Sequence, residues 1–481
     1  MKRGKAVGPD KIPLEFWLEM GDCGLKWLTA LFNKIKSGSP MPDAFRKSYL
    51  LPFSRKGDSR KLNNYRAIKL TSHTLKIYER VVNNRLKNIT RLHDNQCGFV
   101  EGKSTIDAIQ CLRILMEKHR DARKDLFLVF IDLEKAFDRV PRELIWLALR
   151  AHDIPEVYVS MIMDMYDDAR TRVRCTAGES EEFTVKVGVH QGSVLSPMLF
   201  NIIMSYLQKL IGDETEICLL FADDVVLGST DIVALQNALS KWDKILKDHG
   251  LKISVKKTEF LPCQFSDPER PNPDIFIGEE KLMVCSRFKY LGSVVNSKAS
   301  CDDDIKHRTS VGWMKWRENS SVFCDKKMPR KLKGKLYATV IRPALLYASE
   351  CWTMYKTYES KLTAAEMKML RMTTGVTKLD HIKSKYIRGS LFVQKPITEA
   401  HNERQMRWYC HVQRRPPENP AKKAISTIVP ANGRRAGRPK NTWICQMEKC
   451  QQRMGLSDDM IQDRNACRRV LRSNTHTSGG A

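Results

Sequence analysis

Apolar runs in the middle of the chain end in carboxylates. Residues 126–131 form an unbroken apolar segment followed by Asp132, and the apolar runs 217–220 and 225–227 enclose Phe221-Ala222-Asp223-Asp224. Continuous apolar segments of this length are typical of strands buried on both faces. The pattern predicts a buried strand at 126–131 and a β-hairpin over 217–227 with an acidic turn.

Helical periodicity occupies much of the remaining chain. Apolar residues recur at helical spacing over 14–36, 75–89, 141–149, 198–211 and 232–249. Ser196 and Pro197 predict the cap and first residue of the fourth helix, and Gly250 predicts the end of the fifth. Residues 50–53 and 67–70 read as short strands, and the proline-rich segment 264–273 reads as a loop.

The paired carboxylates Asp223 and Asp224 are candidates for metal ligands. Carboxylates against a core are costly unless a cation meets them, and Mg²⁺ prefers such oxygens. With Asp132 they could hold two ions about 4 Å apart, the arrangement that serves in-line phosphoryl displacement. The alternatives are a solvated hairpin turn for the pair and a strand-end cap for Asp132.

Several motifs in a fixed order carry a resemblance to a known family. FIDLEKAFD (130–138), GVHQGSVLSP (188–197) and FADD (221–224) resemble the palm of a reverse transcriptase from a non-LTR (LINE-type) retrotransposon, with an RTE-like element as the candidate clade. Further similar blocks lie at 8–13, 64–70, 96–105, 250–259 and 288–292. Ala67 departs from the family pattern, which has proline there.

The resemblance implies an α+β fold shaped like a right hand, with fingers, a palm built on an antiparallel sheet and a helical thumb. It implies three regions: fingers and palm over 1–295, a helical thumb or connection over 296–395, and a basic, mostly helical C-terminal region over 396–481. It also implies RNA-directed DNA polymerase activity on an RNA template and a DNA primer. Deoxynucleoside triphosphates and two Mg²⁺ ions, or Mn²⁺, complete the expected set of ligands.

The resemblance also implies a role for each matching residue. Asp132, Asp223 and Asp224 would bind the metals, and Lys257 would donate a proton to the leaving pyrophosphate. The nucleotide would meet Lys56, Arg66, Phe137, Gln191 and Gly192, with Phe137 as the gate against a 2′-hydroxyl. Tyr290, Leu291 and Gly292 would hold the primer end. Phe137 could instead be a core aromatic, Lys56 or Arg66 a surface charge, and Gly292 a turn glycine.

Charge is distributed unevenly along the chain. The 481 residues carry 82 Lys and Arg against 55 Asp and Glu, a formal net charge of +27. Residues 301–481 hold 36 of the basic and 16 of the acidic residues. Such an excess favours a polyanion-binding region over a merely solvated surface. Within it, Arg434, Arg435, Arg438 and Lys440 form a basic turn predicted to contact nucleic acid.

The remaining features bound the possible functions. No apolar stretch is long enough to cross a bilayer, and no signal peptide is evident, so we expect an intracellular protein of the nucleus or cytoplasm with no membrane partner. Cys410, His411, Cys445 and Cys450 match no compact zinc spacing. The family usually carries an endonuclease ahead of the leader segment 8–13, so a fragment or decayed copy is expected. The alternative functions are a catalytically silent, basic nucleic-acid-binding remnant and an RNA-dependent RNA polymerase.

Overall fold

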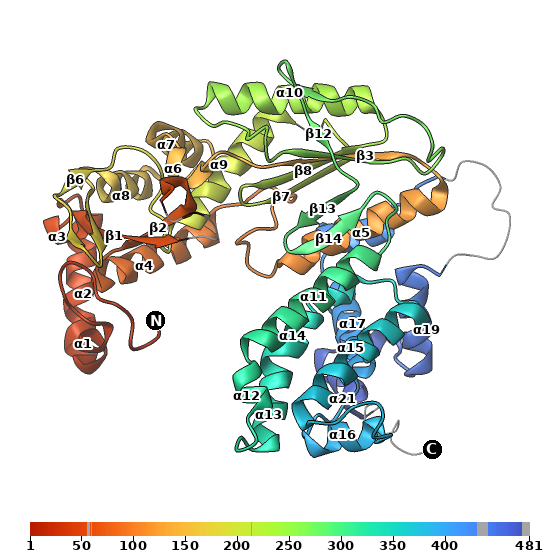
Figure 1. Cartoon of the computed structure of the whole chain (residues 1–481). Coiled ribbons are helices and arrows are strands. Elements are labelled where there is room, and N and C mark those ends of the chain that lie inside the picture. The colour runs from red at the N-terminus through yellow and green to blue at the C-terminus, as the bar shows by residue number, and fades with distance from the viewer. Residues whose placement is uncertain (55–57, 59, 213, 431–440, 474–481) are drawn as a thin grey trace.

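The computed structural model describes the whole chain except residues 55–57, 59, 213, 431–440 and 474–481 (Figure 1). At its centre lies a five-stranded sheet in the order β12-β9-β3-β8-β7. Its strands are β3 (Leu126–Ile131), β7 (Ile217–Phe221), β8 (Asp224–Ser229), β9 (Glu259–Cys263) and β12 (Met283–Val284). β3 pairs antiparallel with both β8 and β9, which confirms the predicted buried strand, and β7 pairs antiparallel with β8, which confirms the predicted hairpin.

The central strand β3 divides its side chains between two cores. All six of its residues are buried, and successive side chains of a strand point to opposite faces. Its odd-numbered residues join a core with helices α4 (His73–Ile89), α7 (Arg142–Arg150), α8 (Glu156–Tyr166), α9 (Ser196–Ile211) and α10 (Ile232–Asp248). Its even-numbered residues join a second core built on α5 (Thr105–Ala122).

Predicted helices agree with the structure apart from local details. The segment 14–36 forms two helices, α1 (Leu14–Glu19) and α2 (Gly21–Lys36), because the chain turns at Gly21 with φ 51°. Ser196 was expected to cap α9, but it lies within the helix, and its hydroxyl donates to the His190 carbonyl over 2.8 Å. Gly250 ends α10 as predicted, with φ 75°.

A second sheet forms the fingers, on the left of Figure 1. Its strand order is β2-β1-β4-β5, and β6 also pairs with β4. The strands are β1 (Lys47–Ser54), β2 (Tyr65–Leu70), β4 (Arg170–Cys175), β5 (Gly178–Glu179) and β6 (Phe183–Thr184). The short helix α3 (Asp43–Arg46) directly precedes β1, and the short helix α6 (Ala136–Arg139) follows the end of β3.

Beyond the palm the chain is helical. Two hairpins, β10 (Phe276–Ile277) with β11 (Glu280–Lys281) and β13 (Arg287–Tyr290) with β14 (Ser293–Asn296), precede the predicted thumb. Its helices are α11 (Asp302–Glu318), α12 (Ser320–Cys324), α13 (Arg330–Leu336), α14 (Arg342–Leu345), α15 (Lys356–Thr374) and α16 (Ser384–Ser390), with a π-helical turn at Tyr337–Ile341. No helix in the described ranges is both long and apolar enough to cross a bilayer.

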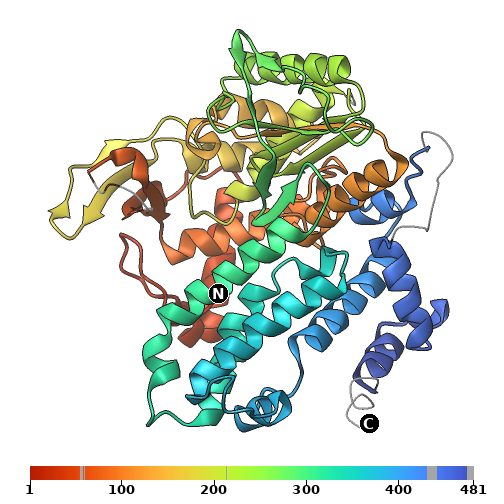
Figure 2. The same ribbon diagram turned by 45° about the vertical axis from the view of Figure 1, so that its right-hand side comes forward.

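The C-terminal helices pack against the palm and thumb (Figure 2). They are α17 (Ile397–Gln413), α18 (Pro420–Ser426), α19 (Trp443–Arg453), α20 (Asp458–Gln462) and α21 (Arg464–Ser473). α18 lies along α5, where the Asn419 amide donates to the Asp107 carboxylate over 3.2 Å. Trp443 is 1 % exposed in the α5 core, and its backbone N–H donates to Glu117 over 3.0 Å. The region after residue 395 therefore supplies part of the palm's second core.

Candidate active site

The acidic hairpin is closed by a two-residue turn. Phe221 pairs with Asp224 in the β7–β8 register, so Ala222 and Asp223 form the tip. Ala222 adopts a left-handed conformation with φ 57°, which is unfavourable for a residue with a Cβ. Contacts from surrounding residues must therefore stabilise this turn conformation. The turn conformation then determines the position of the Asp223 carboxylate.

Residues 95–98 provide those contacts. The Gln96 Oε1 atom accepts from the Ala222 N–H over 3.2 Å, and the Cys97 N–H donates to the Leu220 carbonyl over 2.7 Å. A Cβ at Gly98 would lie 2.5 Å from the Ala222 nitrogen, so only glycine permits this approach. The sequence placed 96–105 among the family motifs but gave Gln96 no role. Its sequence signal is a polar side chain two residues before a glycine.

Asp132 lies beside this hairpin because β3 and β8 are neighbours, with Ile131 opposite Val225. Residues 252–258 run alongside it: the Ser254 N–H donates to the Asp132 carbonyl over 2.8 Å. The Lys257 ammonium forms an ion pair with the Asp132 carboxylate at 3.0 Å. The predicted ligand Asp132 and the predicted proton donor Lys257 are thus in direct contact.

The three carboxylates are electrostatically coupled. Burial raises the pKa of Asp223, the Asp132 charge raises it further, and Arg66 and Lys257 oppose the shift. The pKa of Asp224 is raised to about 6, first by burial and then by the charges of Asp223 and Asp132. Three partly desolvated carboxylates that repel one another favour a cation between them.

This donor set fits hard divalent ions. In the described part of the chain, no three ligating side chains have already converged closely enough to hold an ion. The carboxylates of Asp132, Asp223 and Asp224 nevertheless supply oxygen donors of the kind that Mg²⁺ and Mn²⁺ prefer. The pKa values of Asp223 and Asp224 are raised, so nearby cationic groups compensate only part of the charge of these two carboxylates. These side chains would have to move closer together to complete such a site.

The candidate nucleotide residues meet between β2 and α6. The Phe137 ring is partly buried and stacks on Phe200, with centroids 4.4 Å apart. Gln191 Nε2 donates to the Asp138 carboxylate over 2.6 Å, and the Lys69 N–H donates to the Gln191 carbonyl over 2.7 Å. Gly192 has φ 104°. The structure therefore brings Phe137 and the 191–192 loop together.

A buried glutamate that sequence reasoning missed anchors this loop. Glu79 on α4 accepts from the Ser193 hydroxyl over 2.7 Å and from the Val194 N–H over 3.1 Å. Burial raises its pKa, while these two hydrogen bonds oppose the shift. The sequence signal is an acidic residue on the apolar face of a helix, next to Tyr78 and near Val82.

The predicted primer-contacting residues form the turn between β13 and β14. The Tyr290 ring is buried 5.8 Å from Phe130, so it does not face solvent. Leu291 and Gly292 form the turn with φ 46° and 90°. Tyr347 donates to the Leu291 carbonyl over 2.8 Å, and Arg308 donates to the Gly292 carbonyl. Thumb residues thus fix the turn by its carbonyls, and its primer role stays a prediction.

Five predicted binding residues lie outside the described residues. They are Lys56 of the fingers turn and Arg434, Arg435, Arg438 and Lys440 of the basic C-terminal turn. Arg66, their described counterpart in the fingers, lies on β2 opposite Phe53 and is exposed. Its charge acts on Asp223, which places it on the carboxylate side of the fingers.

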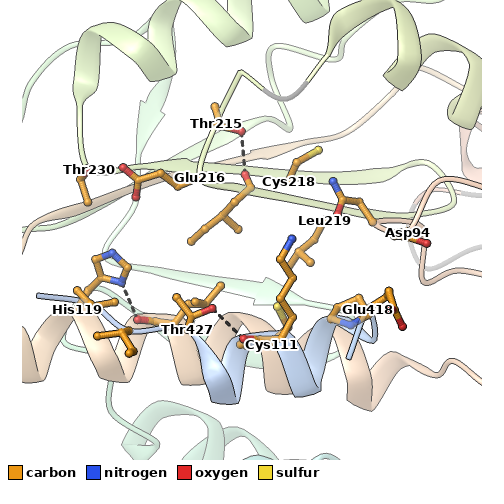
Figure 3. Close-up of a pocket in the computed structure, with 18 of the residues that line it drawn as sticks. Asp94, Cys111, His119, Thr215, Glu216, Cys218, Leu219, Thr230, Glu418 and Thr427 are labelled. Atoms are coloured by element: carbon orange, nitrogen blue, oxygen red, sulfur yellow. Dashed lines mark hydrogen bonds between the residues drawn. The ribbon is translucent and has the colours of Figure 1, made fainter. Parts of the chain in front are cut away.

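A separate cavity of about 860 Å³ lies between α5 and the edge strand β7 of the central sheet (Figure 3). It is lined by α5, by the edge strand β7 and by α18 with the residues after it, including Cys111, His119, Glu216 and Thr427. Burial lowers the pKa of His119, whose Nδ1 lies 2.8 Å from the Leu115 carbonyl. None of the candidate catalytic residues lines this cavity.

Comparison with known proteins identifies the family. Residues 54–295, half of the chain, match the family described as "Reverse transcriptase (RNA-dependent DNA polymerase)". The R2 retrotransposable element Pol polyprotein of Nasonia vitripennis is 26 % identical over 61 % of this chain and 30 % of its own length. The RNA-directed DNA polymerase of the mobile element jockey from Drosophila funebris is 22 % identical over 78 % of this chain and 43 % of its own.

These matches confirm the resemblance to non-LTR retrotransposon proteins, while the RTE-like clade stays a prediction. The chain spans less than half the length of either relative. Among solved structures, apo telomerase from Candida tropicalis aligns with 94 % of this chain and 74 % of its own, at 12 % identity and a TM-score of 0.42.

Proposed function

The chain belongs to the reverse transcriptase family, and we propose that it is an RNA-directed DNA polymerase that extends a DNA primer along an RNA template. The observation that carries the proposal is the position of Asp132 at the end of β3, beside the β7–β8 turn that bears Asp223 and Asp224. The raised pKa values of Asp223 and Asp224, caused by burial and by the neighbouring carboxylates, are typical of functional sites. The relatives named as RNA-directed DNA polymerases support the same reaction class.

In this proposal the three carboxylates hold two divalent ions, Mg²⁺ or Mn²⁺. Bound there, such ions stabilise the attacking and leaving oxygens of a phosphoryl displacement. Lys257, paired with Asp132 at 3.0 Å, holds a proton beside the site and is the proposed donor to the leaving pyrophosphate. Arg66 binds the triphosphate, since its planar guanidinium matches phosphate geometry.

Two further groups shape the nucleotide site in the proposal. The Phe137 ring, held in place by its stack on Phe200, meets the sugar edge of the incoming nucleotide and excludes a 2′-hydroxyl. The 191–192 loop, anchored through Glu79, orients the base pair. The turn at Leu291 and Gly292 supports the primer end.

Primer extension on an RNA template with purified protein and Mg²⁺ tests the proposal. Asp223→Asn keeps the shape of the side chain but removes its charge, which should cost several kcal/mol of transition-state stabilisation and on the order of a thousandfold in rate. Asp248→Asn, at an exposed carboxylate on α10, is the matched control and should extend at the parental rate. Equal rates for the parent chain and Asp223→Asn would refute the assignment. RNA binding without extension would favour the silent remnant.

A further inference from the structure

A cavity of about 380 Å³ between α17 and α21 is lined by seven residues, of which four are arginines. Arg407 and His411 come from α17, Arg414 is the residue that follows it, and Arg464 and Arg468 come from α21. Cys467 and Leu471 complete the lining. We call this cavity the α17–α21 cleft. None of the residues assigned to the polymerase site takes part in it.

The helical repeat and the packing of the two helices force these charges together. Residues three or four apart share a face of a helix, and both the 407–414 and the 464–468 sets have that spacing. α17 packs directly on α21, with Cys410 and Cys467 buried between the helices. The basic faces cannot separate without opening this packing, so the positive charges are held close to one another.

Among the described residues, most of these arginines form no ion pair with a carboxylate. Glu403 pairs with Arg407, and Arg414 donates to the uncharged Ile461 carbonyl over 2.7 Å. Within the described part of the chain, Arg464 and Arg468 form no ion pair. The nearby Asp463 carboxylate accepts from the Asn465 N–H over 2.7 Å at the start of α21.

The histidine in the cleft responds to this field. Burial lowers the pKa of His411 most, the Arg415 charge lowers it further, Asp107 opposes the shift, and Arg414 and Arg464 add smaller lowering effects. A site with several clustered arginines and few counter-charges attracts an anion. A guanidinium group matches the geometry of phosphate oxygens and can bind two of them through parallel N–H···O hydrogen bonds.

We propose that the α17–α21 cleft binds the phosphate backbone of a nucleic-acid strand outside the polymerase site. The inference deepens the proposed function, because nucleic acid is the polyanion that a polymerase handles. In Figure 2 the helices of the predicted thumb lie between the C-terminal helices on the right and the fingers segments on the left. A strand held there is a part of the template or primer strand distant from the reacting end.

The test compares two double variants of the full chain with equal net charge. Arg464→Gln/Arg468→Gln removes two charges from the cleft, and Arg453→Gln/Arg469→Gln removes two exposed charges of the C-terminal region outside it. Labelled single-stranded RNA, and DNA of the same sequence, are titrated at several salt concentrations without nucleotide or divalent ion. A chain without polymerase activity would therefore give the same answer.

The cleft variant should bind more weakly, and the slope of log affinity against log salt should shrink by about 0.7 for each lost contact, roughly 1.4 for the pair. The control should keep a slope close to that of the parent chain. Equal slopes for the two variants would overturn the proposal. Binding of RNA alone, or of both strands, decides which nucleic acid the cleft takes.

Hydrogen exchange locates the contact independently of the variants. Adding RNA to the parent chain should slow exchange of backbone amides in α17 and α21, and this protection should disappear in the cleft variant. Protection confined to the fingers and palm would overturn the proposal. The thermal midpoint of the cleft variant should not fall below that of the parent, because removing like charges relieves repulsion, so weaker binding cannot be ascribed to unfolding.

Discussion

Neutralising Asp224 should stabilise the metal-free protein while it damages the metal site. The carboxylate is held against the palm core beside Asp223 and Asp132, and its pKa is raised to about 6. Asp224→Asn preserves the shape of the side chain and removes the charge. Stability gained by removing a functional charge is the expected signature of an active site that the protein does not neutralise by itself.

The sign and size follow from proton linkage. A carboxyl whose folded pKa lies above its unfolded value, here about 6 against 3.8, binds protons more tightly in the native state. Compared with the ionised carboxylate, the protonated Asp224 stabilises the fold fully below about pH 3.8, and this stabilisation is lost as pH rises through about 6. Above that range the ionised group opposes folding by about 3 kcal/mol. At about pH 5 the opposition is about 1.5 kcal/mol.

The assay is thermal unfolding in the presence of a chelator at about pH 5 and about pH 7.5. Asp224→Asn should raise the midpoint at both, and more at the higher pH, where about 3 kcal/mol corresponds to roughly 6 to 12 °C for a domain of palm size. Asp248→Asn is the exposed control and should change neither midpoint. Mg²⁺ should then raise the midpoint of the parent chain more than that of Asp224→Asn. A gain that is absent, or equal at the two pH values, would refute the reasoning.

Two other substitutions test the nucleotide site and the C-terminal packing. Phe137→Val should reduce discrimination against ribonucleotides by roughly 10- to 200-fold in single-nucleotide insertion, since one steric contact is lost; unchanged discrimination in an active variant would leave Phe137 as a core aromatic stacked on Phe200. Trp443→Ala should cost about 3–5 kcal/mol in urea unfolding, because the ring is 1 % exposed, whereas Trp27→Ala, at 53 % exposed, should cost far less. Equal losses for the two tryptophans would contradict the packing described.

The sequence predicted the strands that carry the three carboxylates correctly because their signal is local. An unbroken apolar run such as 126–131 is typical of a strand that is buried on both faces. Carboxylates directly after such a run then lie at the end of the strand. The contacts that hold those carboxylates in place are not local. Gln96 reaches Ala222, and Glu79 reaches Ser193, across more than a hundred residues of chain.

The C-terminal region was harder to foresee for a different reason. Apart from α17 its helices are short, and the prolines between 416 and 420 are typical of a loop. In the structure Asn419 caps α18 through the Ala421 N–H and also contacts Asp107 on α5. A few large buried residues, such as Trp443, supply most of the packing. Their spacing in the sequence does not predict which surface of the protein they contact.

This packing changes how the basic rear of the chain can be tested. Removing residues 396–481 would take away the proposed phosphate contacts, but it would also expose the face of α5 that α18 and α19 cover. Because the even-numbered residues of β3 lie in the same core, that loss would reach the strand that carries Asp132. Weak RNA binding by a truncated chain could then reflect an unfolded palm. Charge-matched point variants separate the two effects, since they remove a phosphate contact and leave the shared core in place.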